Sequence, residues 1–211
     1  MTAEPKFRRR KADRPAEIVQ AAMAVFAEKG FAAAKLDEIA ARAGVSKGAL
    51  YLYFETKEDL FRAVVRDAIS PNLTVVKGLI ASHPGPFEGL VRAVADRVAT
   101  LVETTPLGGV AKMVIGEARN FPELARLWYD ELVSQLIFAV AAAIEAAQTR
   151  GEVRPGNPRI YALQMASPLL MATLWRETFT PVGAPPFDIR EVMAQHADTF
   201  LRGLRPDEVR T

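Results

Sequence analysis

A short stretch near residue 50 carries side chains suited to reading double-stranded DNA. In a helix, Gly48 would let the backbone approach the base edges, Leu52 could touch a thymine methyl group, and Lys47 could reach guanine or a phosphate. Tyr51 would add a phenolic donor for a phosphate, and Ala49 keeps the surface small. We call these five residues the reading face, and their chemistry predicts insertion into the major groove.

Two short amphipathic helices joined by a tight turn are expected to position the reading face. Apolar residues recur at helical spacing from Leu36 up to Gly44, which allows the positive φ at which a helix ends. Ser46 is a good N-cap for a second helix, whose Leu50 and Phe54 would point back into the first. A helical hairpin in any core has this periodicity. An ordinary exposed helix face, however, carries both charge signs, and no Asp or Glu occurs between positions 39 and 54.

A longer pattern surrounds this pair of helices between residues 18 and 60. It consists of Ala21, Ala22, Phe26, Gly30, Phe31, Ile39, Ala40, Ala43, Gly44, Val45, Ser46, Gly48, Leu50, Tyr51, Tyr53, Phe54, Lys57, Glu58 and Leu60. With these residues the chain resembles the DNA-binding domain of the TetR family of bacterial transcriptional regulators. The resemblance implies a three-helix domain with a helix-turn-helix, followed by a helical domain that binds a ligand and forms a homodimer.

The chain departs from the family pattern just before the first of the two short helices. Where the family usually has two hydroxyl residues, this chain has Ala34 and Lys35. Lys35 could replace a hydroxyl bond to phosphate with a charge contact, which would make DNA binding more sensitive to salt. Lys57, at the start of the next helix, is a second expected phosphate anchor. The predicted DNA contacts are Lys35, Ser46, Lys47, Gly48, Ala49, Tyr51, Leu52, Tyr53 and Lys57.

Composition limits the class of protein. With 211 residues, 50% of them hydrophobic and 25% charged, the chain is long enough for one or two compact units. It has no cysteine and only two histidines, so we expect no disulfide, no metal site and no cofactor. The N-terminal residues lack the apolar core of a signal peptide, and the apolar runs near 132–144 and 162–175 fall short of the roughly 20 residues of a membrane span. We therefore expect a cytoplasmic protein that does not enter a membrane.

Positive charge is concentrated in the N-terminal third. Residues 1–66 hold 13 Lys and Arg against 9 Asp and Glu, whereas the remaining residues hold 14 against 16. Most of the excess lies in residues 1–14, which we expect to form a disordered basic arm. Such arms follow the DNA backbone or enter the minor groove, so the arm would touch DNA beside the reading face. A tail that only aids solubility is the alternative.

Helical patterns divide the chain into two domains, and no strand pattern appears. A first helix over 15–29 and the two short helices form the predicted helix-turn-helix domain, residues 15–56. The regulatory and dimerisation domain, 57–205, opens with a helix from 57 to about 69 that could act as a lever on the reading face, with Pro71 as its hinge or simply its end. Gly30 is the expected end of the first helix, and prolines and glycines delimit helices near 87–103, 106–119, 122–150, 158–178 and 188–204, the last of which opens with the capping pattern of Asp188 and Glu191. The sequence thus predicts an all-α chain of about nine helices.

The second domain shows no pattern typical of an enzyme. It has no nucleophile elbow, no phosphate-binding glycine loop and no His-x-x-x-His pair. Polar residues on otherwise apolar stretches instead suit a small-molecule pocket, although for each one alone a surface position or a salt bridge is the simpler explanation. The candidate ligand residues are Met113, Glu117, Arg119, Phe121, Trp128, Tyr161, Gln164 and Trp175.

The last two helices are the predicted dimer interface. They carry more apolar surface than two terminal helices need for internal packing, and two such pairs across a two-fold axis would form a four-helix bundle. The candidate interface residues are Ile160, Leu163, Leu170, Met171, Leu174, Val192, Met193, His196 and Phe200.

These features together indicate a TetR-like DNA-binding transcriptional regulator. The resemblance implies a repressor that binds a palindromic operator as a homodimer and is released by a small molecule. The expected partners are operator DNA, an unknown effector and a second copy of the chain. The alternatives are an activator, or a helical ligand-binding or scaffold protein that does not bind DNA.

Overall fold

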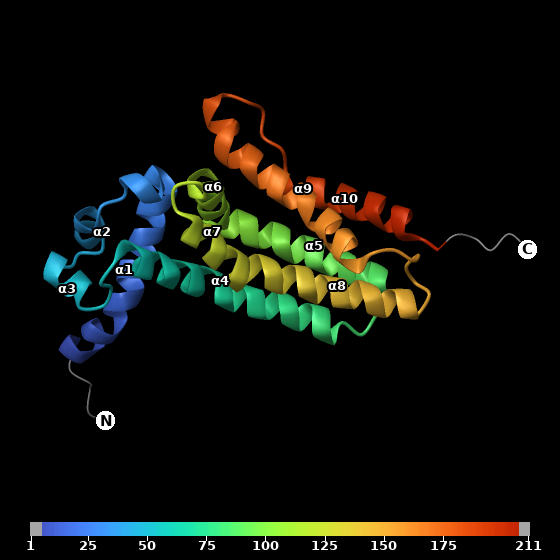
Figure 1. Cartoon of the computed structure of the whole chain (residues 1–211), viewed down its shortest axis with the longest axis horizontal. Helices are drawn as coiled ribbons and strands as arrows, with labels where there is room; N and C mark the ends of the chain where they lie inside the picture. Colours follow the sequence, from blue (N-terminus) through green and yellow to red (C-terminus); the bar gives the residue numbers. More distant parts are fainter. Residues whose placement is uncertain (1–5, 207–211) are drawn as a thin grey trace, which may run out of the picture. The chain divides into compact units, whose positions relative to one another are not determined.

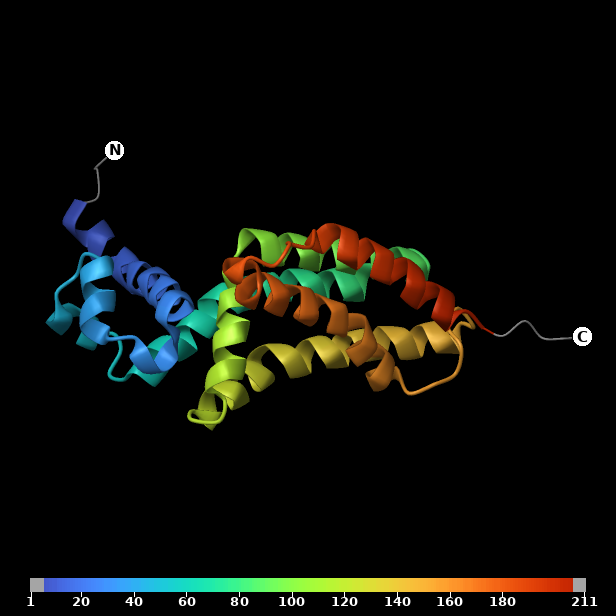
Figure 2. The ribbon, with the colours of Figure 1, turned by 90° about the horizontal axis from the view of Figure 1, so that it is seen from above.

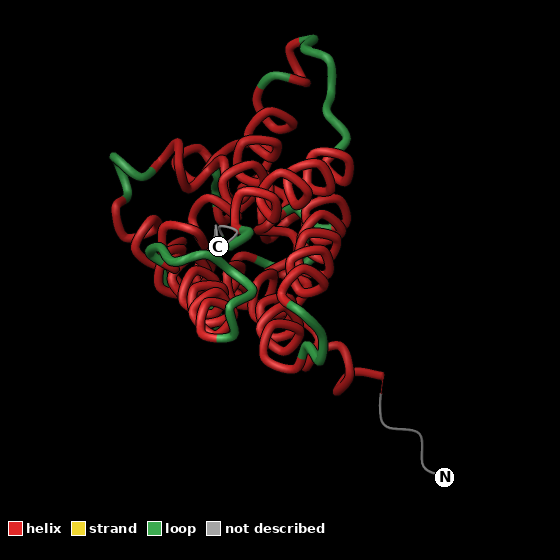
Figure 3. Tube along the Cα trace, turned by 90° about the vertical axis from the view of Figure 1, so that its right-hand side faces the viewer, coloured by secondary structure: helices red, strands yellow, loops and turns green. Residues whose placement is uncertain are grey.

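The computed structural model describes residues 6–206, with side chains described for 14–67 and 72–206. Every regular element in this part of the chain is helical, and no strand occurs there, which confirms the all-α prediction (Figures 1 and 3). A π-helical turn, η1 (Tyr129–Val133), separates α7 from α8, and a 3-10 turn, η2 (Thr180–Val182), follows α9. The α-helices are α1 (Lys6–Ala33), α2 (Leu36–Arg42), α3 (Lys47–Tyr51), α4 (Lys57–Ser82), α5 (Phe87–Thr104), α6 (Leu107–Glu117), α7 (Pro122–Trp128), α8 (Ser134–Thr149), α9 (Pro158–Thr178) and α10 (Ile189–Leu204).

The chain divides into two compact units. The first comprises the residues up to 68 together with 109–128, and the second comprises 69–108 and the residues from 129 onward. The predicted boundary after residue 56 assumed that each domain is one uninterrupted segment of the chain. The first unit, in contrast, also contains the start of α4 and most of α6 with α7, because the chain returns to it after α5.

An aromatic cluster forms the core of the first unit. Phe26, Phe31 and Phe61 are completely buried, and their ring centroids lie 5.5 to 5.9 Å apart. Phe61 meets the other two rings edge to face, an arrangement that contributes about 0.5–1.5 kcal/mol per pair beyond burial. The cluster therefore fixes the end of α1 against the start of α4.

Helix α1 differs from its prediction at both ends. Gly30 interrupts the helical backbone with φ 78°, as expected of a helix stop, and a short continuation reaches Ala33. At the other end the helix begins at Lys6 rather than near Pro15, because the Lys and Arg residues there are good helix formers. The backbone of residues 6–14 is helical, where the sequence analysis expected a disordered arm over 1–14, and residues 1–5 lie outside the described residues.

Helix α4 is longer than predicted. It passes position 71 and ends at Ser82, so the prediction of an end near residue 69 is wrong, while the role of Pro71 as a hinge stays a prediction. A proline inside a helix costs about 3 kcal/mol. The apolar residues beyond it keep the helical spacing, and burial of Leu73 and Val76 offsets part of this cost.

The core of the second unit lies between α5, α8, α9 and α10, which the two views in Figures 1 and 2 show running alongside one another. Its last helix is strongly amphipathic, because its buried residues recur every three or four positions. The Asp188 carboxylate caps α10 as the sequence predicts, accepting the N–H groups of Arg190 and Glu191 at 2.8 and 3.2 Å. The buried residues of α10 are Ile189, Met193, Ala197, Phe200 and Leu204.

The run from Pro122 to Thr149 is one continuous helical stretch of 28 residues, and by length and composition alone it could span a membrane. A helix over 122–150 was predicted here, with an apolar run near 132–144 too short for a membrane span. Helices in the core of a bundle pass the same test, and α8 does contribute Ala141, Ile144 and Ala147 to the core of the second unit.

Candidate nucleic-acid interface

The turn between α2 and α3 has the geometry that its sequence predicts. Gly44 adopts φ 67°, and the N–H of Val45 closes the turn by donating to the carbonyl of Ala40 at 3.0 Å. The Ser46 hydroxyl caps α3 by accepting the N–H of Ala49 at 3.2 Å, so its own proton stays available to a phosphate. Leu50 is completely buried and holds α3 against α2.

The reading face is exposed except for the half-buried Ala49, and the fold does not explain its residue types. Leu52 is 82% exposed and Tyr51 43% exposed, although both are large hydrophobic side chains. A Cβ at Gly48 would meet no atom within 4 Å, and Gly48 is not in the left-handed region. A helical glycine costs about 1 kcal/mol relative to alanine. What Gly48 offers is therefore close approach by another molecule, as a base-reading helix requires.

Lys47 has an ionic partner that the sequence analysis missed. Its Nζ lies 2.8 Å from Oδ1 and 3.0 Å from Oδ2 of Asp37, in the first turn of α2. The hydrogen bond with Asp37 raises the pKa of Lys47. Asp37 lies just outside the acid-free stretch between positions 39 and 54, and only the crossing of the two helices brings it to Lys47.

Lys57 occupies a different place from the one predicted. Its ammonium donates to the carbonyls of Phe31, Ala32 and Ala34 at 2.6, 3.2 and 3.2 Å, and Nζ lies 4.5 Å from the centroid of the Phe31 ring. An ammonium has three donors, and all three are used. The end of α1 leaves carbonyls without helical partners, and Lys57 satisfies them. The prediction of Lys57 as a phosphate anchor therefore disagrees with its geometry.

Two other predicted DNA contacts, Lys35 and Tyr53, differ in how exposed their side chains are. Lys35 is exposed at the N-terminus of α2, where its ammonium can reach a phosphate. Tyr53 is only half-buried and follows the reading face. Lys35, Ser46 and Tyr51 are thus exposed residues of this surface that can donate hydrogen bonds to phosphates.

Comparisons with known proteins agree with this geometry. Residues 18–64 match the family model of the bacterial regulatory proteins of the tetR family, and residues 89–204 match that of the C-terminal domain of AefR-like transcriptional repressors. The chain belongs to the TetR family. It is therefore a DNA-binding transcriptional regulator with a helix-turn-helix, as the sequence analysis predicts.

Similar proteins cover different shares of this TetR-family chain. The fatty acid metabolism regulator of Bacillus subtilis is 36% identical over 149 residues, which are 71% of this chain and 75% of that protein. The first curated relatives are matched over 22 to 66% of their own length.

Two solved structures share the fold. A putative TetR-family regulator from Mesorhizobium loti is 28% identical with a TM-score of 0.74, covering 92% of this chain and 96% of its own. FadR from Bacillus subtilis in complex with stearoyl-CoA is 19% identical with a TM-score of 0.75, covering 90% and 99%.

The eight candidate ligand residues are divided between the two compact units. Met113, Glu117, Arg119, Phe121 and Trp128 belong to the first, and Tyr161, Gln164 and Trp175 to the second. Several have polar groups that the chain itself satisfies. Glu117 Oε1 accepts the N–H of Ala32 at 3.0 Å, the Tyr161 hydroxyl donates to the carbonyl of Pro155 at 3.1 Å, and Trp175 Nε1 donates to that of Pro185 at 2.9 Å.

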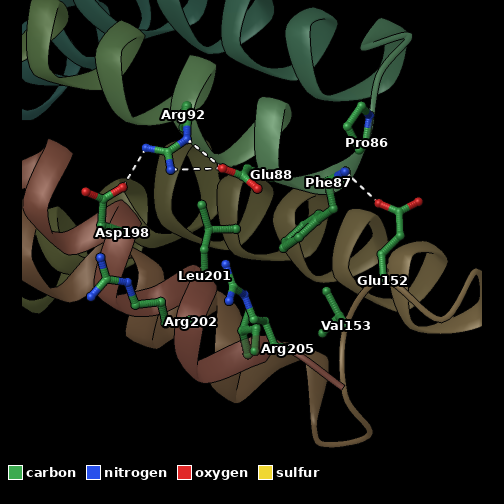
Figure 4. A pocket seen from close by; sticks show the side chains of 11 residues that line it. Pro86, Phe87, Glu88, Arg92, Glu152, Val153, Asp198, Leu201, Arg202 and Arg205 are labelled. Carbon is green, nitrogen blue, oxygen red and sulfur yellow. Dashed lines mark hydrogen bonds and ion pairs between the residues drawn. The ribbon is translucent and has the colours of Figure 1, made fainter. Parts of the chain in front are cut away.

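A cavity of about 380 Å³ opens in the second unit, and none of the eight candidates lines it. The start of α5, the turn at 152–153 and the end of α10 form its walls (Figure 4). Arg92 lies between Glu88 and Asp198, bonding to them at 2.9 and 2.7 Å, and the Glu152 carboxylate accepts the N–H of Phe87 at 2.6 Å. Arg150 and, secondly, this N–H lower the pKa of Glu152. The carboxylates of the cavity are thus all paired.

The predicted dimer residues fall into two groups. Ile160, Leu163, Leu170 and Met171 of α9 are 46 to 60% exposed, and we call these four the α9 stripe. Leu174, Val192 and His196 are half-buried. Met193 and Phe200 are buried in the chain's own core at 5% and 8% exposure, so they offer little surface to a second copy, and the prediction disagrees with their burial.

Proposed function

We propose that this TetR-family protein is a repressor that binds a palindromic operator as a homodimer and leaves it when a small molecule binds. The observation that carries the proposal is the reading face, where Gly48 and the exposed Leu52 have no role in folding. Close backbone approach and an apolar side chain suit base edges in the major groove. Since its target is the chromosome, we place the protein in the cytoplasm.

The small size of the reading helix supports the proposal of a homodimer. Helix α3 has five residues, and one such helix buries too little surface for selective binding. A two-fold partner places a second helix in the next turn of the major groove, about 34 Å away. The α9 stripe supports this proposal, because it presents four neighbouring apolar side chains that the chain leaves uncovered.

Release would begin where α6 and α7 meet the end of α1 within the first unit. Glu117 holds the N–H of Ala32, and the Phe121 ring lies 5.0 Å from the Phe31 ring. An effector that shifts α6 or α7 would pull on these contacts, and so on the carbonyls that Lys57 holds at the start of α4. The effector shifts the equilibrium only by binding the DNA-free form better.

The class of effector is suggested by similarity alone. FadR of Bacillus subtilis binds stearoyl-CoA, and the relative with 36% identity regulates fatty acid metabolism. We therefore propose a largely apolar small molecule, which suits a helical domain with an apolar core.

The test is direct binding to DNA. The protein should select an operator from a pool of duplexes with a randomised centre of about 30 base pairs, enough for two half-sites one turn apart. The selected sequence should be palindromic, and its affinity should fall steeply as salt rises. Binding that selects no sequence, or that does not depend on salt, would contradict the proposal and support a helical protein that no longer reads DNA.

A further inference from the structure

Among the residues of α1, α2 and α3 that the structure describes, three ion pairs neutralise cations. Each joins an exposed lysine or arginine to a carboxylate of a neighbouring helix, with N–O distances of 2.6 to 2.8 Å. Two of the cations lie on α1 and α2, whereas the third belongs to the reading face. The pairs are Lys29 with Glu38, Arg42 with Glu28, and Lys47 with Asp37.

The pair on the reading face engages both oxygens of its carboxylate, as the Arg42–Glu28 pair also does, but only this pair holds a cation of the reading face. Both carboxylate oxygens of Asp37 lie within hydrogen-bond distance of one ammonium, at 2.8 and 3.0 Å. Asp37 lies in the first turn of α2, and Lys47 is the first residue of α3. The ammonium is thus held toward α2, at the edge of the surface that meets DNA.

Stability gives only a small reason for an acid in this position, about 0.3–1 kcal/mol from the dipole of α2, whose first turn holds Asp37. The side chains of Lys47 and Asp37 are 59% and 63% exposed, and ion pairs between exposed groups contribute about 0–1 kcal/mol. A carboxylate at a surface that binds phosphates, in contrast, weakens that binding. We therefore expect Asp37 to act mainly in DNA sequence selection rather than in the stability of the fold.

We propose that Asp37 is a positioning residue that gives the protein sequence specificity by holding Lys47 away from phosphates. On random DNA, Lys47 would have to give up its contacts with both oxygens of Asp37 in order to contact one phosphate. That exchange adds little to the affinity. At the operator, O6 and N7 of a guanine offer two acceptors in a fixed position, and the exchange becomes favourable. Like-charge repulsion between Asp37 and the backbone of the wrong site adds to the difference. This inference rests on the proposed function of operator binding.

The size of the effect follows from counterion release. One further lysine contact with phosphate makes the slope of log affinity against log salt steeper by about 0.9, which is roughly eightfold in affinity at 0.1 M salt. Asp37→Asn should therefore tighten binding to random DNA by roughly that factor. At the operator Lys47 is already engaged with a base, so affinity there should change by about twofold or less. The ratio between the two affinities should fall at least about fourfold.

The experiment measures fluorescence anisotropy of the full chain with two duplexes, the operator that the wild-type protein selects and a random sequence of equal length, across a range of salt. Wild-type and Asp37→Asn proteins are compared, and thermal unfolding verifies that both are folded. An unchanged ratio and an unchanged salt slope in Asp37→Asn would overturn the inference while leaving operator binding intact. Failure of the wild-type protein to select any operator would overturn the proposed function as well.

Three further variants separate the effect of freeing Lys47 from the effect of removing the negative charge of Asp37. In a Lys47→Met background, Asp37→Asn should change binding to random DNA by less than about twofold, because no ammonium remains to be freed. Asp37→Glu should restore the wild-type ratio. Glu55→Gln removes an exposed carboxylate that follows the reading face without freeing a cation, and should leave the salt slope unchanged. A full gain from Asp37→Asn in the Lys47→Met background would show that repulsion alone acts, and would overturn the role of Lys47.

Discussion

The reading face and the candidate ligand residues differ in how the fold uses them. On the reading face, Gly48 and the exposed Leu52 have no role in packing. Its one charged residue, Lys47, pairs only with the exposed Asp37. Glu117, Tyr161 and Trp175, in contrast, each make a hydrogen bond within the chain. A residue that folding does not explain indicates function more strongly than a polar residue within an apolar stretch, since such a residue can be fully satisfied by its own chain.

The largest expected effect comes from the α9 stripe. Leu163→Glu with Met171→Glu should give monomers, because two charges would have to be buried in the proposed dimer. Operator affinity should then fall by about a thousandfold, toward that of non-specific binding. Light scattering and anisotropy measure the two effects. Val75→Glu, an exposed apolar residue of α4, is the matched control, and a dimer that survives both charges on α9 would place the interface elsewhere.

Lys57 should act on stability rather than on DNA. Lys57→Met leaves the carbonyls of Phe31, Ala32 and Ala34 without their donor, which should cost about 1–3 kcal/mol in the free energy of unfolding. Urea denaturation measures this loss. The salt slope of operator binding should stay as in the wild type at temperatures where the variant is folded. A shallower slope with unchanged stability would return Lys57 to the phosphate contacts.

Gly48→Ala should change folding and binding in opposite directions. With open space around the added methyl group, the variant should be more stable by up to about 1 kcal/mol. Its operator affinity should nevertheless fall about tenfold or more, since the methyl group separates α3 from the base edges. Unfolding and anisotropy experiments on one preparation measure both. Unimpaired binding would mean that Gly48 does not face DNA.

The smallest effect concerns His196. Burial lowers the pKa of its imidazole below 6.5, although a hydrogen bond with the Met165 backbone acts the other way. The unfolded chain therefore takes up a proton first, so the contribution of His196 to stability is complete above about pH 6.5 and is lost as the pH falls below it. We expect a loss of less than about 1 kcal/mol between pH 7 and 5.5 that His196→Gln does not show. Equal losses in both proteins would assign the effect to other groups.

The sequence was sufficient for features that depend on neighbouring residues. The turn at Gly44, the caps at Ser46 and Asp188 and the stop at Gly30 are local, because each follows from the conformations of a few adjacent residues. The reading face was predictable for the same reason, since helical periodicity places its residues opposite Leu50.

Features that depend on distant parts of the chain were not predictable in this way. Nothing near Lys57 shows that the end of α1 will lie beside it, and nothing near Lys47 shows that α2 will present Asp37. The helical spacing likewise places Phe200 and Leu163 on apolar helix faces. It does not show that Phe200 packs into the chain's own core while Leu163 is exposed. Pro71 locally favours the end of a helix, yet α4 continues beyond it, where Leu73 and Val76 are buried.

The most direct test of this account is hydroxyl-radical footprinting of the selected operator with the full-length wild-type protein. The proposed dimer with α3 in the major groove predicts two protected half-sites on one face of the duplex, about one helical turn apart and related by a two-fold axis. Leu52→Ala should alter base preference symmetrically in both half-sites. A single protected site, or uniform protection without a two-fold axis, would contradict it.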